Sequence, residues 1–67
     1  METLIEYECC YIPTMAKCTR IVRVEYLRAQ NSHITGDNNE FCDKLLKRWN
    51  NSAKGLWKYN LVRIYKG

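Results

Sequence analysis

The stretch DNNEFCDKLLKRWNNSAKG, residues 37–55, decides the fold of this chain. Its apolar residues recur at the spacing that places them on one side of an α-helix, and its charged residues fall on the other side. The apolar stripe consists of Phe41, Cys42, Leu45, Leu46 and Trp49. We expect the rest of the chain to cover this stripe.

Capping signals mark both ends of the predicted helix. Asp37 is a candidate N-cap, because its carboxylate can accept from the backbone N–H three residues on, and Glu40 is placed to complete a capping box. At the other end Lys54 suits the negative helix terminus, and Gly55 suits a left-handed C′ position. The helix is therefore predicted to lie between Asp37 and Gly55.

Two segments before the helix predict strands. Residues 3–12 alternate in polarity, and residues 18–28 are rich in β-branched side chains. The residues that share a face are Ile5, Tyr7, Cys9 and Tyr11 in the first strand, and Val22, Val24 and Tyr26 in the second. Pro13 begins a plausible loop between them, so the two strands are expected to form an antiparallel hairpin.

Residues 56–66 predict a third strand with imperfect alternation. Trp57, Tyr59 and Leu61 share one face, whereas Val62 and Ile64 lie on the other. This pattern indicates a bulge, a twist or two contacted faces. If Val62 and Ile64 face outward, the open sheet face carries apolar area of the kind that marks a protein-binding surface.

Charge suggests how the strands are ordered. Glu6 and Glu8 belong to the first strand, while the other two strands carry cations, namely Arg20, Arg23, Arg28, Lys58, Arg63 and Lys66. A central first strand would place its carboxylates beside cations on both neighbours. We therefore predict one α+β domain over residues 1–67, with β-β-α-β order, an all-antiparallel sheet in the order 2-1-3, and the helix on one face.

Size and composition narrow the class of protein. The chain has 67 residues, a net charge of +4 and a pI near 9.0, which favours weak attraction to polyanions or to an acidic protein surface. No segment approaches the roughly 20 apolar residues of a membrane span, and the first residues lack the pattern of a secretory signal. A soluble protein in the bacterial cytoplasm, without membrane contact, is the expectation.

The cysteines and the histidine offer little chemistry. Cys9 and Cys10 are adjacent and point to opposite faces of a strand, so these and Cys18 and Cys42 lack the paired spacing of a structural zinc site. Cys9 and Cys42 are expected to be buried, and Cys10 to be exposed and oxidisable. Since His33 lies alone in a polar connection, the prediction is a protein that is not an enzyme and that uses no metal or cofactor.

A basic surface beside aromatic residues gives the candidate binding site. Lys44, Lys47, Arg48 and Lys54 form a cationic helix face close to the aromatic third strand, and Arg23 and Lys58 are further candidates on the outer sheet face. Cations interleaved with aromatic rings can hold phosphates and stack bases. The alternative is that these residues have no binding role, with the cations on a solvated helix surface and the aromatic residues in a core strand.

The order of hairpin, helix with a cysteine, and closing strand Trp57-Lys58-Tyr59-Asn60-Leu61-Val62 resembles small prophage-encoded proteins of enterobacteria, one group of which is described as zinc-binding. The chain also resembles tiny phage inhibitors of host or defence machinery, such as anti-CRISPR or antitoxin-like proteins. This resemblance implies a phage-type accessory protein that binds and inhibits a bacterial protein or nucleoprotein complex. The alternatives are a small basic nucleic-acid-binding module and a zinc-stabilised domain.

Overall fold

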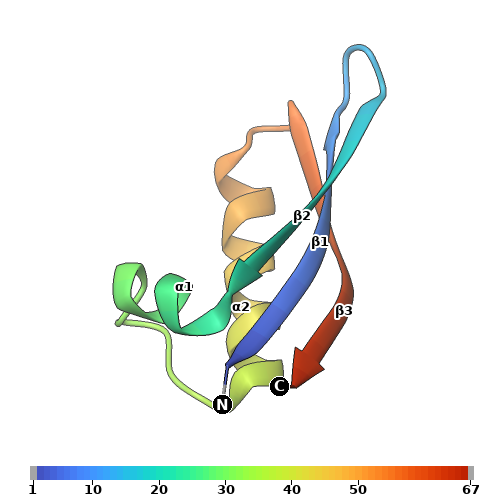
Figure 1. The fold of residues 1–67 in the computed structure, drawn as a ribbon. Coiled ribbons are helices and arrows are strands. Elements are labelled where there is room, and N and C mark those ends of the chain that lie inside the picture. The colour runs from blue at the N-terminus through green and yellow to red at the C-terminus, as the bar shows by residue number, and fades with distance from the viewer. Residues whose placement is uncertain (1, 67) are drawn as a thin grey trace.

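Residues 2–66, which the computed structural model describes, form an α+β fold of three strands and two helices (Figure 1). In chain order the elements are β1 (Thr3–Tyr11), β2 (Ala16–Arg23), α1 (Val24–Gln30), α2 (Asn38–Ser52) and β3 (Trp57–Lys66). The strands pair antiparallel in the order β2-β1-β3, which confirms the predicted topology. The hairpin of β1 and β2 reaches beyond the end of α2, and the start of β1 lies beside the end of β3.

The second predicted strand is too long, because the chain becomes helical at Val24. β2 ends at Arg23, and the following seven residues form α1, so the order of elements is β-β-α-α-β. Val24 and Leu27 are both buried, at the spacing that brings two side chains onto one helix face. Because Val22, Val24 and Tyr26 alternate as in a strand, the sequence pattern did not indicate this short helix.

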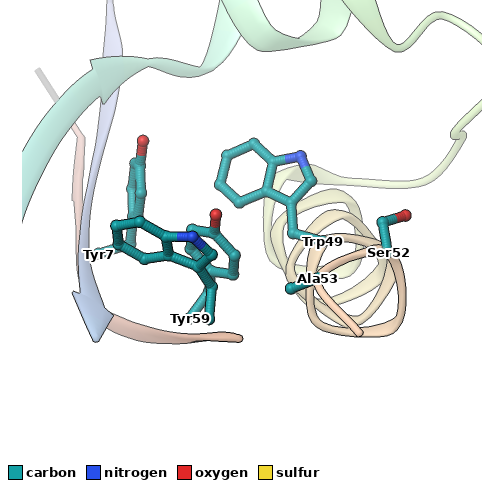
Figure 2. A pocket seen from close by; sticks show the side chains of 6 residues that line it. Tyr7, Trp49, Ser52, Ala53 and Tyr59 are labelled. Carbon is teal, nitrogen blue, oxygen red and sulfur yellow. The ribbon is translucent and has the colours of Figure 1, made fainter. Parts of the chain in front are cut away.

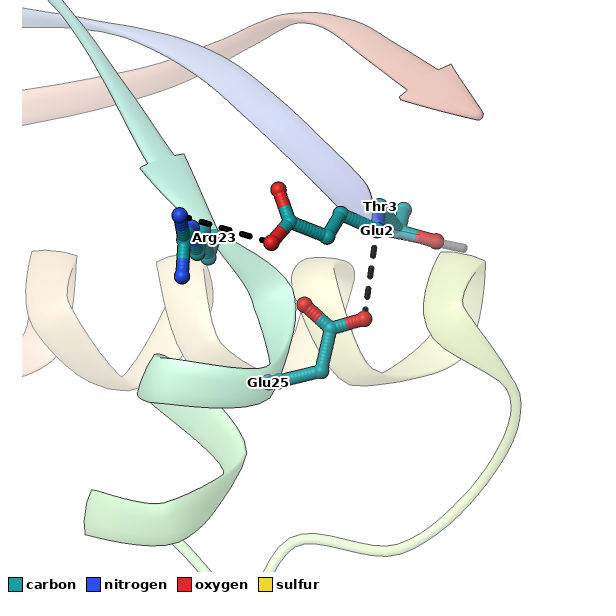
Figure 3. Close-up of polar contacts among 4 residues, drawn as sticks. All are labelled: Glu2, Thr3, Arg23 and Glu25. Carbon is teal, nitrogen blue, oxygen red and sulfur yellow. Dashed lines mark hydrogen bonds and ion pairs between the residues drawn. The ribbon is translucent and has the colours of Figure 1, made fainter. Parts of the chain in front are cut away.

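Polar contacts link the start of β1 to the junction between β2 and α1 (Figure 3). The amide of Thr3 donates to the carboxylate of Glu25 over 3.3 Å, and Glu2 pairs with Arg23 over 3.4 Å. Glu25 lies in the first turn of α1, where a negative charge is favoured. Hydrogen bonds from its own amide and from that of Thr3 lower the pKa of Glu25.

The ends of α2 largely follow the sequence prediction. The Asp37 carboxylate accepts from the Glu40 amide over 2.9 Å, which confirms the N-cap. At the other end Ala53 is the C-cap, and both Lys54 and Gly55 have left-handed backbone, with φ of 52° and 79°. Gly55 is thus left-handed as expected, but Lys54 takes the C′ position that the prediction gave to the glycine.

A bulge in β3 resolves the imperfect alternation of that strand. Glu6 pairs with Arg63 and Tyr7 pairs with Leu61, so Val62 is the extra residue. The bulge returns Ile64 to the face of Leu61, where it packs against the core. The suggestion that Ile64 faces outward with Val62 is therefore wrong, whereas Val62 is indeed exposed.

The core lies between α2, α1 and the inner face of β1. Its buried side chains are Ile5, Tyr7, Cys9, Val24, Leu27, Phe41, Cys42, Leu45 and Leu46. Trp49, at the end of the predicted stripe, is only partly buried. The amphipathic pattern of α2 thus correctly identified the residues that the sheet covers.

The electrostatic argument gave the right strand order, but only Arg63 of the expected cations lies opposite a glutamate of β1. Glu6 lies opposite Ile21 and Arg63, and its carboxylate accepts from the Tyr65 hydroxyl over 2.9 Å. Glu8 lies opposite Thr19 and Asn60, neither of which is charged. Within residues 2–66 the ion pair present is the one between Glu2 and Arg23.

Candidate functional site

One end of the molecule carries a hollow lined by aromatic side chains. It lies between the last turns of α2, the start of β3 and the middle of β1, and has a volume of about 310 Å³. Figure 2 shows Trp49 from α2 facing Tyr7 and Tyr59 from the sheet. We call this hollow the aromatic groove, and its lining residues are Tyr7, Trp49, Ser52, Ala53, Trp57 and Tyr59.

The four aromatic rings of the groove support one another. The ring centroid of Trp49 is 5.2 Å from that of Tyr7 and 5.4 Å from that of Tyr59, both in tilted geometry. Trp57 stacks on Tyr59 with centroids 6.3 Å apart and packs against Tyr11 at 5.1 Å. Such pairs favour fixed ring positions within the groove.

Asn50 fixes the position of β3 at the groove. β3 is an edge strand, and the side-chain amide of Asn50 satisfies the outward backbone groups of Tyr59. The Tyr59 amide donates to the Asn50 oxygen over 2.7 Å, and the Asn50 nitrogen donates to the Tyr59 carbonyl over 3.0 Å. These two hydrogen bonds satisfy the Tyr59 backbone as a neighbouring strand would, and they join α2 to β3.

A second hollow adjoins the aromatic groove on the β2 side. It shares Tyr7, Trp57 and Tyr59 with the groove and adds Cys9, Cys18 and Arg20. We call it the thiol hollow. Of the β2 residues, Val22 packs against the core, whereas Cys18 and Arg20 are exposed. The hollow lies where this part of β2 is left uncovered.

A third hollow adjoins the groove on the α2 side, where the two share Ser52. Its lining, the basic hollow, consists of Lys44, Lys47, Arg48, Asn51 and Ser52. Lys44 also donates to the Thr35 carbonyl over 3.4 Å. The structure therefore brings together the three basic residues of α2 that the sequence singled out.

Exposed apolar side chains lie in or next to the two turns at the same end of the molecule as the aromatic groove. The Ile12 amide donates to the Leu56 carbonyl over 2.8 Å, which places the β1–β2 turn beside the α2–β3 turn. Met15 lies in the same β1–β2 turn, with its amide 3.3 Å from the Ile12 carbonyl. The apolar rim consists of Ile12, Met15, Leu56 and Trp57, which are 37%, 61%, 51% and 39% exposed.

The other predicted binding residues lie apart from the basic hollow. Lys54 is in the turn after α2, and Arg23 is at the end of β2, where it pairs with Glu2. Lys58 is on β3, opposite Cys10 on the outer sheet face. The six predicted residues thus form one cluster of three and three separate positions.

The cysteines differ from the prediction at one position. Cys9 and Cys42 are buried as expected, and burial raises the pKa of each thiol. Cys10, expected to be exposed, is only 4% exposed. Its register partners on the outer face are Lys17 and Lys58, whose long aliphatic stems can cover a small side chain.

Metal-binding groups do not converge in the part of the chain that the structure describes. Across residues 2–66, no three His, Cys, Asp or Glu side chains meet in a way that could hold an ion. His33 lies exposed in the turn after α1.

Sequence reasoning missed Asn50 and the role of Arg20. Arg20 was assigned only to charge balance within the sheet, yet it pairs in register with Tyr7 and lines the thiol hollow. Its alternation with Val22 was a usable signal, since residues two apart on a strand share a face. Asn50 carried no such signal. Its partners are the backbone groups of Tyr59, nine residues further on, and backbone groups do not depend on the residue type.

Comparison of the chain with family models, curated proteins and solved structures finds no match. Neither α1 nor α2, within the described residues, has the length and apolarity that a helix needs to cross a bilayer. The functional argument therefore rests on the geometry of the groove and its surroundings.

Proposed function

We propose that this chain is a non-enzymatic protein-binding module whose contact surface is the aromatic groove together with its apolar rim. The observation that carries the proposal is the exposure of Trp57, which lines the groove, together with that of Ile12, Met15 and Leu56 in the two adjoining turns at this end of the molecule. Interfaces are enriched in Trp, Tyr, Met and Arg, and their binding energy concentrates in a few such side chains. Trp57, Tyr59 and Arg20 supply this composition here.

Charge favours an acidic partner. Arg20 lies on one side of the groove, and Lys47 and Arg48 lie on the other, while the whole chain carries a net charge of +4. A partner that places an apolar side chain in the groove and carboxylates at its edges would match both features. Complementary charge of this kind accelerates association and selects the partner.

The finer proposal is a phage or prophage accessory protein that inhibits a bacterial host or defence protein or nucleoprotein complex in the cytoplasm. The partner class comes from the anti-CRISPR-like resemblance, and the aromatic groove supports the protein-binding part of the proposal. Inhibition would then follow from occlusion of the partner's own functional surface.

Two exposed apolar residues at different places provide the test. Leu56→Ser changes the apolar rim, and Ile21→Ser changes the outer face of β2, where the side chain is 58% exposed compared with 51% for Leu56. Tagged variants are compared for capture of a bacterial partner after nuclease treatment. We expect Leu56→Ser to lose the partner and Ile21→Ser to keep it, with both variants folded by circular dichroism. The reverse pattern would place the contact on the outer sheet face.

The second candidate is a nucleic-acid-binding module, favoured by the contact between the basic hollow and the aromatic groove at Ser52. Cations beside stacked rings are the usual surface for single strands. Charge reversal of Lys44, Lys47 and Arg48 together would then weaken binding to any sequence and flatten the dependence on salt. A protein-binding module would instead show little affinity for nucleic acid before the change.

A further inference from the structure

Two cysteines stand directly opposite each other in the sheet. Cys9 of β1 and Cys18 of β2 are register partners on antiparallel strands. Such partners project from the same face, with Cα atoms about 4.5–5.5 Å apart. A disulfide needs a Cα separation of roughly 4.4–6.8 Å. The backbone therefore already holds these two thiols at a separation that a disulfide accepts.

Their surroundings give the two thiols different roles. Cys18 is exposed and Cys9 is 5% exposed, and both line the thiol hollow beside Arg20. Burial raises the pKa of the Cys9 thiol, and the nearby Cys18 sulfur adds to this shift while Arg20 opposes it. An oxidant from solvent can therefore reach Cys18 first, with Cys9 behind it as the second thiol.

The other two cysteines are placed elsewhere. Cys10 points to the opposite face of β1 and has lysines as register partners on both sides. Cys42 is fully buried on α2. Cys9 and Cys18 are thus the pair that the sheet register joins.

We propose that Cys9 and Cys18 form a reversible redox pair that a peroxide converts to an intrachain disulfide. The Cys18 thiol gives up its proton, and the thiolate attacks one peroxide oxygen. The O–O bond breaks, Cys18 becomes a sulfenic acid, and the departing hydroxide takes up that proton and leaves as water. The Cys9 sulfur then attacks the Cys18 sulfur, the S–O bond breaks, and a second water leaves with the Cys9 proton. Two thiols and one hydrogen peroxide thus yield one disulfide and two waters, and a dithiol reductant reverses the change by exchange.

The disulfide would join β1 to β2 at the thiol hollow. It closes a short loop that contains the turn with Pro13 and Met15, so it restricts the unfolded chain. The oxidised protein should therefore show a higher thermal midpoint than the reduced protein. Formation of the disulfide and the rise in the thermal midpoint do not depend on the proposed protein partner.

The test uses the full reduced chain treated with hydrogen peroxide and analysed by mass spectrometry. We expect a mass lower by two hydrogen atoms, restored by dithiothreitol. Trypsin cleaves after Lys17 and Arg20, so a linked pair should contain the peptide Cys18-Thr19-Arg20 and the peptide that carries Cys9. In Cys10→Ser the same linked pair must persist, which assigns the bond to Cys9 and Cys18.

The matched variant is Cys18→Ser, which changes an exposed side chain. It should lose the linked peptides entirely, and its thermal midpoint should no longer rise with peroxide. Interchain dimers through Cys18, over-oxidation of Cys18 without a link, or a link to Cys10 would each overturn the proposal. Should Cys18→Ser fail to fold, the peptide maps of the native chain and of Cys10→Ser still decide it.

Discussion

The two ends of the α2–sheet layer differ in what fills them. At the closed end, around the start of α2, the side chains of Ile5, Val24 and Phe41 are at most 1% exposed. At the open end, around the last turn of α2, Trp49 and Tyr59 are half-buried and Trp57 is exposed. The closed end is therefore closely packed, whereas the aromatic side chains at the open end are only partly buried.

Polar contacts sharpen the same difference. At the closed end Arg28 donates to the Gly36 carbonyl over 2.8 Å and to the Asn38 side chain over 3.0 Å, and its guanidinium lies 4.5 Å from the centre of the Phe41 ring. Asn38 in turn donates to the Thr3 hydroxyl over 3.2 Å. At the open end Asn50 alone makes the side-chain link between α2 and β3 among the hydrogen bonds of residues 2–66. Close packing and exposed aromatic surface are thus separated along one helix.

The largest effect on stability should come from Phe41→Ala at the closed end. Truncating a fully buried phenylalanine costs about 3–5 kcal/mol, comparable to the whole stability of a small domain. Trp57→Ala, at the open end, should cost clearly less because Trp57 is 39% exposed. Chemical denaturation of both variants measures the difference. Equal losses would erase the distinction between the two ends.

Asn50→Ala should have an intermediate effect. It removes two hydrogen bonds and leaves backbone groups of Tyr59 unpaired on the edge of β3, at a cost of about 1–3 kcal/mol. Asn51→Ala, one residue further on the exposed side of α2, is the matched control and should change stability little. Amide hydrogen exchange at Tyr59 should accelerate in Asn50→Ala only. Unchanged exchange there would show that Asn50 does not hold β3.

Gly36→Ala should destabilise the connection to α2 by about 1–2 kcal/mol. Gly36 has φ of +115°, and an added Cβ would lie 2.9 Å from the Cβ of Glu40 and 2.5 Å from its carboxylate. Both the backbone angle and the contact therefore disfavour any side chain. Ser32→Ala, at an exposed position of the same connection, provides the control in thermal unfolding. A neutral Gly36→Ala would mean that this connection adapts freely.

The smallest effect should be the pH dependence that Glu25 contributes. Because its folded pKa is lowered from 4.5, the unfolded chain binds the proton more readily, and stability rises with pH through this range. The contribution is complete above the unfolded pKa and is lost as pH falls through the folded pKa. Glu25→Gln should flatten the acid side of the stability curve slightly. An unchanged curve would indicate that the Thr3–Glu25 bond adds nothing measurable.

The sequence predicted the fold well wherever one period dominated. Phe41 and Leu45 repeat at helical spacing with a capping aspartate before them, and both are buried as expected. Val24 shows the limit, because it continues the strand alternation from Val22 and also begins the helical pair with Leu27. The choice between strand and helix at Val24 depends on its packing in the core against residues of α2, which lie far from it in the sequence.

The site was less predictable than the fold. The basic residues Lys44, Lys47 and Arg48 were identified from helical spacing, and they do share one hollow. The aromatic groove was not identified, because it depends on how the last turns of α2 pack against β1 and β3. The bulge at Val62 similarly decided which face Ile64 occupies.

The most direct test of the central claim is hydrogen exchange measured with and without a captured bacterial partner. We predict that binding slows exchange in residues 12–16 and 53–59, which contain the apolar rim and part of the lining of the aromatic groove. Exchange in residues 24–42, at the closed end, should stay unchanged. Protection confined to residues 17–23 or to the closed end, with none around the groove, would contradict the assignment of the open end as the binding surface.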